Sequence, residues 1–217
     1  MEIEANLPPA TTWPDNPYQA SWAATDYMYS AEGPGEFPNH ACKLTYLLSK
    51  PFIKNFRTAL DIGCRVGEFT RYLQLDFDQV SAFDPTLCAK FRFNVDLGKV
   101  THYHCALGDE RGDIRMYDGA HHERLGIAPR IVPVFPLDMF DFQNVDYIKI
   151  DVEGFEKKVL LGGARTIERW NPVIVIEQNH VVLDGEAQYS AKEYLESIGY
   201  RNVAVDKRGW DFVMVRE

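Results

Sequence analysis

The chain has 217 residues, of which 46% are hydrophobic and 25% are charged, a balance typical of a soluble globular protein with one main domain. Its formal net charge of -9 disfavours nucleic acids as partners, because their phosphates need cationic side chains. No stretch approaches about eighteen consecutive apolar residues, and the acidic start MEIEANLPPATT has no apolar run, so we expect neither a membrane span nor a signal peptide. Four scattered cysteines without a C-x-x-C pair favour a reducing, cytoplasmic environment over a disulfide framework or a zinc site.

The first fifty residues differ in character from the rest of the chain. Residues 1 to about 38 are rich in Pro, Asn, Gly and aromatics and have weak periodicity, which predicts an irregular arm. The stretch HACKLTYLLSK that follows has apolar residues at helical spacing, and Pro51 ends it. We therefore divide the chain into an arm with one helix, residues 1–50, and a main domain, residues 51–217.

From residue 58 onward, predicted strands and helices alternate. We expect strands at 58–62, 79–84, 100–107, 145–152 and 172–178. We expect helices at 67–74, 86–95, 153–170 and 187–199, and two short extended pieces at 113–117 and 131–135 around a polar loop. The final stretch YRNVAVDKRGWDFVMVR reads as a hairpin around DKRG. This order predicts an α/β fold with a doubly wound, mostly parallel seven-stranded sheet that includes a C-terminal antiparallel hairpin strand.

Acidic residues end four of the predicted strands. They are Asp61, Asp84, Asp151 and Glu177. In doubly wound sheets the ligand binds beyond the carboxyl ends of the strands, so we expect these side chains to border the site. Lys149 precedes Asp151 by two residues and therefore lies on the same face of its strand, where we expect it to pair with a neighbouring carboxylate.

A glycine turn follows the first strand of the main domain, in LDIGCRVGEF. Gly63 and Gly67 allow a ligand to approach the backbone next to the start of a helix. The spacing matches neither the dinucleotide fingerprint G-x-G-x-x-G nor a P-loop. Asp84, about twenty residues later, is placed to bind the two hydroxyls of a ribose. A ribose acid without a pyrophosphate loop suggests a nucleoside ligand without phosphates, and S-adenosyl-L-methionine fits.

Five segments of the main domain form a recognisable series. They are, in order, ALDIGCRVGEFTRYL, VSAFDP, CALGDERGDIRMY, LDMF and VDYIKIDVEGFEKKVLLGGARTIERWNPVIVIE. In this order they resemble the FkbM-type methyltransferases. The resemblance implies a class I, Rossmann-like fold that uses S-adenosyl-L-methionine, and methyl transfer that is usually to oxygen. It implies cofactor-binding roles for Asp61, Gly63 and Gly67 at the methionine moiety, Asp84 at the ribose, and Ala106 and Leu107 at the adenine. The chain departs from the family pattern at Cys64-Arg65, where Arg65 either reaches the carboxylate of the cofactor or points to solvent.

The chemistry of O-methylation needs a group that orients the acceptor hydroxyl and one that removes its proton. We expect Asp151 to orient the hydroxyl and Lys149 to offset its charge, with His180 as a candidate base. A divalent cation such as Mg²⁺ held by Asp151 and Glu177 is the alternative way to lower the pKa of the hydroxyl. The histidines at 102 and 104 are expected to be structural, and the pair at 121–122 lies in the polar loop.

The predicted function is O-methylation of a hydroxyl on a small molecule or carbohydrate. Three alternatives remain open: a nicotinamide-dependent oxidoreductase on a similar sheet, a methyltransferase acting on a nucleic acid, whose base-binding motif the stretch DNPY at 15–18 resembles, and a non-catalytic nucleoside-binding module. We also hypothesise that the arm is a lid over the acceptor pocket, lined by Trp13, Tyr18, Trp22 and Tyr27. The alternative is that the arm packs on the second subunit of a homodimer.

Overall fold

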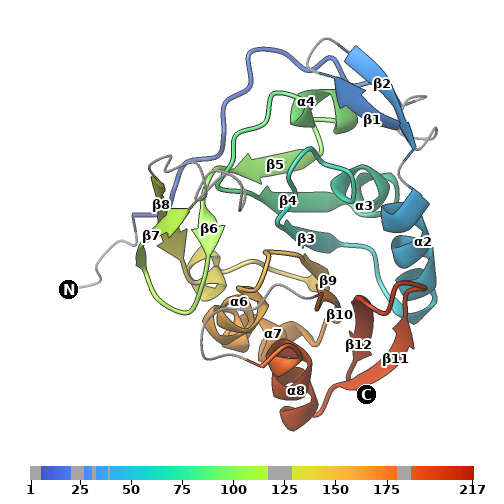
Figure 1. The fold of residues 1–217 in the computed structure, drawn as a ribbon, viewed down its shortest axis with the longest axis vertical. Helices are drawn as coiled ribbons and strands as arrows, with labels where there is room; N and C mark the ends of the chain where they lie inside the picture. The colour runs from blue at the N-terminus through green and yellow to red at the C-terminus, as the bar shows by residue number, and fades with distance from the viewer. Residues whose placement is uncertain (1–5, 21–26, 31–32, 39, 117–128, 180–186) are drawn as a thin grey trace.

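A seven-stranded sheet runs through the centre of the molecule (Figure 1). The structure is a computed structural model that describes residues 6–20, 27–30, 33–38, 40–116, 129–179 and 187–217. In spatial order the strands are β11 (Arg201–Val205), β12 (Asp211–Val215), β10 (Val173–Glu177), β9 (Val145–Ile150), β3 (Thr58–Ile62), β4 (Gln79–Phe83) and β5 (Val100–Tyr103). Strands β10, β9, β3, β4 and β5 are parallel, and β12 is antiparallel to both of its neighbours. The predicted doubly wound sheet with a C-terminal hairpin is confirmed.

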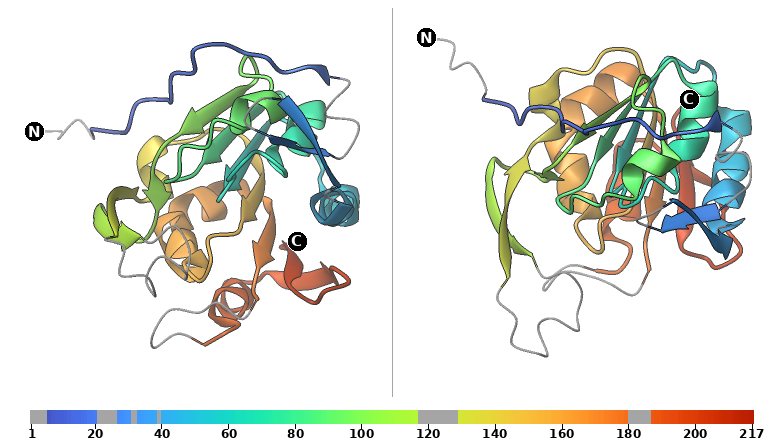
Figure 2. Two further views of the ribbon diagram at one scale, coloured as in Figure 1. Left: turned by 45° about the horizontal axis from the view of Figure 1, so that its top comes forward. Right: turned by 90° about the horizontal axis from the view of Figure 1, so that it is seen from above.

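Helices cover both faces of the sheet, as the view from above shows (Figure 2). One face carries α2 (His40–Ser49), the short helix η1 (Lys50–Phe52), α3 (Thr70–Asp76) and α4 (Phe91–Asn94). The other carries η2 (Leu137–Phe140), α6 (Glu156–Gly162), α7 (Ala164–Trp170) and α8 (Ser190–Ser197). Two hydrophobic clusters result, one on each face. The two central strands β3 and β9 are buried along their whole length, so the charged residues within them, Asp61, Asp146 and Lys149, lie in the interior of the molecule.

Three elements differ from their predicted extents. The helix expected at 153–170 is divided between α6 and α7 at Gly163, whose backbone, with φ -112° and ψ 13°, is not helical. The strand expected at 100–107 ends at Tyr103. Its last two residues form β6 (Ala106–Leu107) in a separate sheet with β8 (Arg130–Phe135) and β7 (Gly112–Met116). The helix expected at 86–95 is a single turn, α4.

The arm packs along one edge of the sheet. Its residues Ala10 and Thr11 extend the sheet beyond β5: Ala10 forms an antiparallel bridge to Tyr103, and the Thr11 N–H donates to the carbonyl oxygen of His102 at 2.7 Å. Trp13 then stacks on Phe91 of α4, with 5.9 Å between ring centroids. The arm is less irregular than predicted, since it also contains a hairpin of β1 (Tyr27–Ser30) and β2 (Gly33–Pro38) (Figure 1). Among the described residues, no helix has the length and apolar character needed to cross a membrane.

Helix α7 begins with a cap from a distant residue. The carboxylate of Asp138, in η2, accepts hydrogen bonds from the backbone N–H groups of Arg165 and Thr166 at 2.9 and 2.8 Å and from the Thr166 hydroxyl at 2.7 Å. These are N–H groups that the helix itself leaves unpaired. We predict that Asp138→Ala lowers the free energy of unfolding by about 1–2 kcal/mol, measured by urea denaturation. Asp113→Ala, the same change at an exposed position of β7, serves as the control, and equal effects of the two substitutions would contradict the capping role.

Candidate active site

Charged side chains gather where β3, β9, β10 and β12 meet at one end of the sheet. In the sheet register, Asp61 of β3 is paired with Lys149 of β9, and Glu177 of β10 is paired with Asp211 of β12. Asp151 follows β9 directly and lies beside Glu177. We call Asp61, Asp151, Glu177 and Asp211 the acid row. The neighbouring residues on these strands, such as Tyr147 and Val175, pack in the hydrophobic cluster on the α2 face, so the acid row lies under α2.

Lys149 is the buried cation in the middle of the acid row. Its Nζ lies 2.9 Å from Asp151 Oδ2 and 5.5 Å from the centre of the Phe69 ring. Burial by itself would lower the pKa of Lys149, but Asp151, Asp211 and Asp61 outweigh it and raise the pKa above its usual value. The lysine therefore stays protonated, and the predicted pairing with a neighbouring carboxylate is confirmed.

Asp151 and Glu177 share a hydrogen bond between their carboxyl groups. Burial tends to raise the pKa of Asp151, but Lys149, this hydrogen bond and Arg208 lower it overall. The pKa of Glu177 is raised by burial and by the charge of Asp151. The shared proton therefore resides on Glu177, and Asp151 is the ionised partner. The side chain of Asp151 is 34% exposed and that of Glu177 is 11% exposed, so Asp151 presents a carboxylate to solvent.

The acid row has partners that the sequence interpretation missed. Asp211 accepts hydrogen bonds from the Thr45 hydroxyl of α2 at 2.7 Å and from Arg208 of the β11–β12 turn at 2.8 Å. Arg208 also pairs with Asp206 at 2.7 Å and lies 3.9 Å from Glu177. One feature of the sequence did point to this cluster. The charged DKRG turn and Asp211 come just before and at the start of a strand that was predicted to join the sheet.

The glycine turn and the loop after β9 touch each other. Gly63 has φ +86°, and a Cβ on it would be 1.8 Å from the carbonyl oxygen of Asp151. The N–H groups of Gly63 and Cys64 both donate to the carbonyl oxygen of Phe83, at 2.9 and 3.0 Å, which ties the turn to β4. Gly67 has φ +81° and little room for a side chain, since its Cβ would be 2.9 Å from Val95. Both glycines are therefore required by close backbone approach as well as by backbone conformation.

Asp84 lies at the end of β4 beside this turn. Its Oδ2 accepts from the backbone N–H of Arg65 at 2.8 Å, and its Oδ1 accepts from the backbone N–H of Thr86 at 2.6 Å. Burial raises its pKa, and these backbone hydrogen bonds partly oppose the rise. Together with a hydrogen bond from the Thr86 side chain, these bonds fix the carboxylate of Asp84 in place beside the glycine turn. Arg65 joins the site through its backbone N–H, at φ +49°.

Of three predicted cofactor residues, two are less accessible than expected. Asp61 is buried and accepts a hydrogen bond from the Thr70 hydroxyl at 2.5 Å, and burial raises its pKa to about 6. Asp61 lies beside Lys149 in the sheet register and interacts with its charge, two residues before Gly63 of the glycine turn. Leu107 is buried in the hydrophobic cluster on the other face, whereas Ala106 is partly exposed. Of these three, only Ala106 offers side-chain surface to a ligand.

Three carboxylates lie close enough to share a cation. Oxygens of Asp151, Glu153 and Glu177 are within 4.8 Å of one another. Glu153 has φ +54°, in a loop that is closed by Glu156, whose Oε1 accepts from the N–H groups of Val152 and Gly154 at 3.1 Å each. Carboxylate oxygens suit Mg²⁺, although Lys149 and Arg208 already neutralise part of this charge. The candidate base His180 lies outside the described residues, as do His121 and His122.

The arm residues that are described pack beside β5 and α4. Trp13 contacts His102, whose Nδ1 lies 2.8 Å from the Thr11 hydroxyl; His102 is buried, and burial lowers its pKa to about 4. This agrees with its expected structural role. In the DNPY stretch, Asp15 pairs with Arg92 and Asn16 donates to Asp96. Trp22 and the side chain of Tyr27 lie outside the described residues, so the lid hypothesis stays a prediction.

Comparison with known proteins places the chain among methyltransferases. The model of the methyltransferase FkbM domain matches residues 53–202. A crystal structure of methyltransferase FkbM from Methylobacillus flagellatus KT is similar over 78% of this chain, with 18% identity and a TM-score of 0.51. The chain spans 46% of that protein's length. Precorrin 8w decarboxylase from Methanobacterium thermoautotrophicum is similar over 88% of this chain and 97% of its own, with 16% identity and a TM-score of 0.52. No curated protein matches the chain.

The contact between Gly63 and Asp151 leads to a stability prediction. Alanine at position 63 would have both an unfavourable positive φ and a steric clash with the carbonyl oxygen of Asp151. Gly209 is the matched control, because it also has a positive φ, +76°, but a Cβ on it would meet no atom within 4 Å. We predict that Gly63→Ala lowers the free energy of unfolding by about 1–3 kcal/mol more than Gly209→Ala, measured by denaturant titration. Equal losses would show that the two turns do not constrain each other.

Proposed function

Because the chain belongs to the methyltransferase FkbM domain family, we propose that it binds S-adenosyl-L-methionine and methylates a hydroxyl on a small molecule or sugar. The observation that carries the proposal is the ionised, partly exposed carboxylate of Asp151 next to the glycine turn. This carboxylate is a hydrogen-bond acceptor for a hydroxyl, beside the part of the fold where the cofactor's methionine moiety is expected. When bound, the cofactor supplies a methyl group that is made electrophilic by a positively charged sulfur.

The residues of the turn fit the cofactor. The positive φ angles of Gly63 and Gly67 shape the tight turn at the carboxyl end of β3, and the carboxylate of Asp84 lies beside this turn, where we expect the ribose hydroxyls. Ala106 presents a small side chain for the adenine. The acid row contains four carboxyl groups near two cations, Lys149 and Arg208. The resulting negative potential favours a positively charged sulfur over a neutral one.

Asp151 is suited to orienting the acceptor. Its lowered pKa keeps it ionised, so it accepts a hydrogen bond from the hydroxyl and holds the oxygen in line with the methyl group. The new O–C bond forms as the S–C bond breaks, and the hydroxyl proton leaves to His180 as base or to solvent. In the alternative version, Asp151, Glu153 and Glu177 hold Mg²⁺, which lowers the pKa of the hydroxyl.

The cofactor assignment is tested by binding. We predict that S-adenosylhomocysteine binds with a Kd in the micromolar range and that Asp84→Ala weakens it about 5- to 30-fold, the loss expected for hydrogen bonds to a charged group. Asp78→Ala is the matched control, because Asp78 lies immediately before the first residue of β4, whereas Asp84 lies immediately after the last. Isothermal titration calorimetry measures both, and circular dichroism checks that the variants are folded. Absence of binding to the parent protein would overturn the assignment.

The role of Asp151 is tested by turnover with an acceptor found by screening sugars and other hydroxyl compounds. Asp151→Asn keeps the shape and removes the charge, so we predict a loss of about 100-fold or more in kcat, with cofactor affinity within a few fold. Glu153→Gln separates the two versions of the mechanism. If the enzyme uses a metal, Glu153→Gln should lower kcat, and EDTA should inhibit the parent enzyme until Mg²⁺ is added back. If it uses no metal, neither the substitution nor EDTA should change kcat much. Near-parent turnover of Asp151→Asn would make this acid structural.

A further inference from the structure

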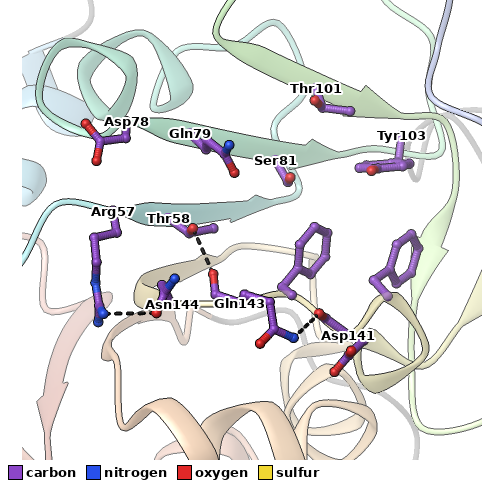
Figure 3. A pocket seen from close by; sticks show the side chains of 12 residues that line it. Arg57, Thr58, Asp78, Gln79, Ser81, Thr101, Tyr103, Asp141, Gln143 and Asn144 are labelled. Carbon is purple, nitrogen blue, oxygen red and sulfur yellow. Dashed lines mark hydrogen bonds between the residues drawn. The ribbon is translucent and has the colours of Figure 1, made fainter.

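A separate pocket, none of whose lining residues belongs to the acid row, lies between the sheet and the connection from η2 to β9 (Figure 3). Its volume is about 490 Å³, within the range of small-molecule sites. Thr58 and Gln79, the first residues of β3 and β4, form one end of it. One side is the face of β4 and β5, and the other is the connection from η2 to β9 (Figure 3). The acid row lies at the carboxyl ends of its strands, so this pocket belongs to a different part of the molecule.

The sheet face in this pocket is polar along its strands. Gln79 and Ser81 are two residues apart on β4 and therefore lie on the same face of the sheet, as do Thr101 and Tyr103 on β5. All four side chains point toward the pocket (Figure 3). Among the strands, the helices of this face, α6, α7 and α8, mainly contact β6, β9 and β11 rather than β4 and β5. Hydroxyl and amide groups would be costly in a dry core, so this part of the sheet suits contact with water or a polar ligand.

An aromatic wall forms the other side of the pocket. The rings of Phe140 and Phe142 stack with 5.5 Å between centroids and only 4° between their planes. Tyr103 packs against Phe140 at 5.2 Å with a steep angle of 73°. Tyr103 also stacks on Phe83, with 5.0 Å between centroids, so these contacts hold the rings in place and make the wall a fixed apolar surface.

Several polar groups in the pocket are available to a ligand. Within the described part of the chain, the side chains of Asp78, Gln79, Ser81 and Thr101 make no hydrogen bond. Ser81 is the most telling, because the residue is only 8% exposed and its hydroxyl faces the pocket (Figure 3). A hydroxyl that is so nearly buried gains free energy from a hydrogen-bonding partner.

The charges of the pocket restrict the kind of ligand. Arg57 is already engaged, since its guanidinium lies 2.6 Å from Asp146 and donates to Asn144 at 3.0 Å. Asp141 is paired with Arg169 at 3.4 Å, so Asp78 is the acid that leaves the lining slightly negative, which disfavours phosphates and carboxylates. The hydroxyls and amides disfavour a purely apolar ligand.

We infer that this pocket binds a neutral saccharide. A sugar ring carries hydroxyl groups around its edge, which suit the amide, hydroxyl and carboxylate groups of the sheet face, and C–H groups on its flat side, which suit the rings of Phe140, Phe142 and Tyr103. The pocket lies away from Asp151, the proposed site of methyl transfer. A saccharide in this pocket is therefore bound without being methylated. The site is independent of the proposed methyl transfer.

The test is a titration followed by nuclear magnetic resonance. Maltose, cellobiose and lactose are added separately to ¹⁵N-labelled protein, and the backbone amide signals of Gln79, Thr101 and Asn144 are monitored. At least one of the sugars should shift them in a saturable manner. The double variant Gln79→Ala/Thr101→Val should weaken that binding about tenfold or more, as expected for two lost hydrogen bonds. Both side chains are exposed, so the variant should remain folded.

The control is Gln19→Ala/Thr12→Val, which makes the same two changes at exposed positions in the arm and should leave sugar binding unchanged. Glucose 6-phosphate should bind no more tightly than glucose. The inference is overturned if none of the three disaccharides gives saturable shifts, if the pocket variant keeps full affinity, or if the phosphorylated sugar is preferred. S-adenosylhomocysteine binding should be the same in all variants, so failure of the saccharide site and failure of the proposed function give different results.

Discussion

The site depends on one buried ammonium group. Lys149 lies inside the sheet among Asp61, Asp151 and Asp211, and without it three carboxylates in neighbouring strands would repel one another in a medium that solvates charge poorly. Its charge keeps Asp151 ionised, while the proton of the carboxyl pair stays on Glu177. The arrangement therefore separates the roles of two acids that lie side by side. A neutral residue at position 149 would leave this negative charge uncompensated, which makes the lysine a condition for the site as well as for the fold.

The glycine turn and the acid row touch through backbone atoms, but only the glycine turn lies wholly within the residues that the family model matches. The glycine turn and the loop after β9 meet at Gly63 and Asp151, so movement of either displaces the other. The family match covers residues 53–202 and so includes both of these segments. It does not include Thr45 on α2 or Arg208 and Asp211 on the last hairpin, which complete the acid row. The family match thus covers the glycine turn, Asp151 and Glu177, but not all the groups that pair with them.

The features predicted from sequence are those that follow from local patterns. Apolar runs that end in an acid identified the strands and the positions of Asp61, Asp84, Asp151 and Glu177, and the two-residue period placed Lys149 beside Asp151. The partners of the acid row could not be predicted, because Thr45 and Arg208 reach it only through the tertiary fold. The division of one predicted helix lies at the non-helical backbone of Gly163, which the spacing of apolar residues does not record. Burial of Asp61 and Leu107 is likewise a property of packing, which is why roles assigned by position alone overstated their access to a ligand.

The short pairing of the arm with β5 has a consequence for the protein's behaviour in solution. A strand at the border of a sheet has a row of unpaired backbone groups, and these can recruit a strand from another molecule. The bridge from Ala10 to Tyr103 and the hydrogen bond from Thr11 to His102 occupy part of that row on β5, and Trp13 closes over the ring of Phe91 next to it. The arm thereby shields the border of the sheet from self-association. Loss of these few residues would expose a template for aggregation even if the core and the site were unchanged.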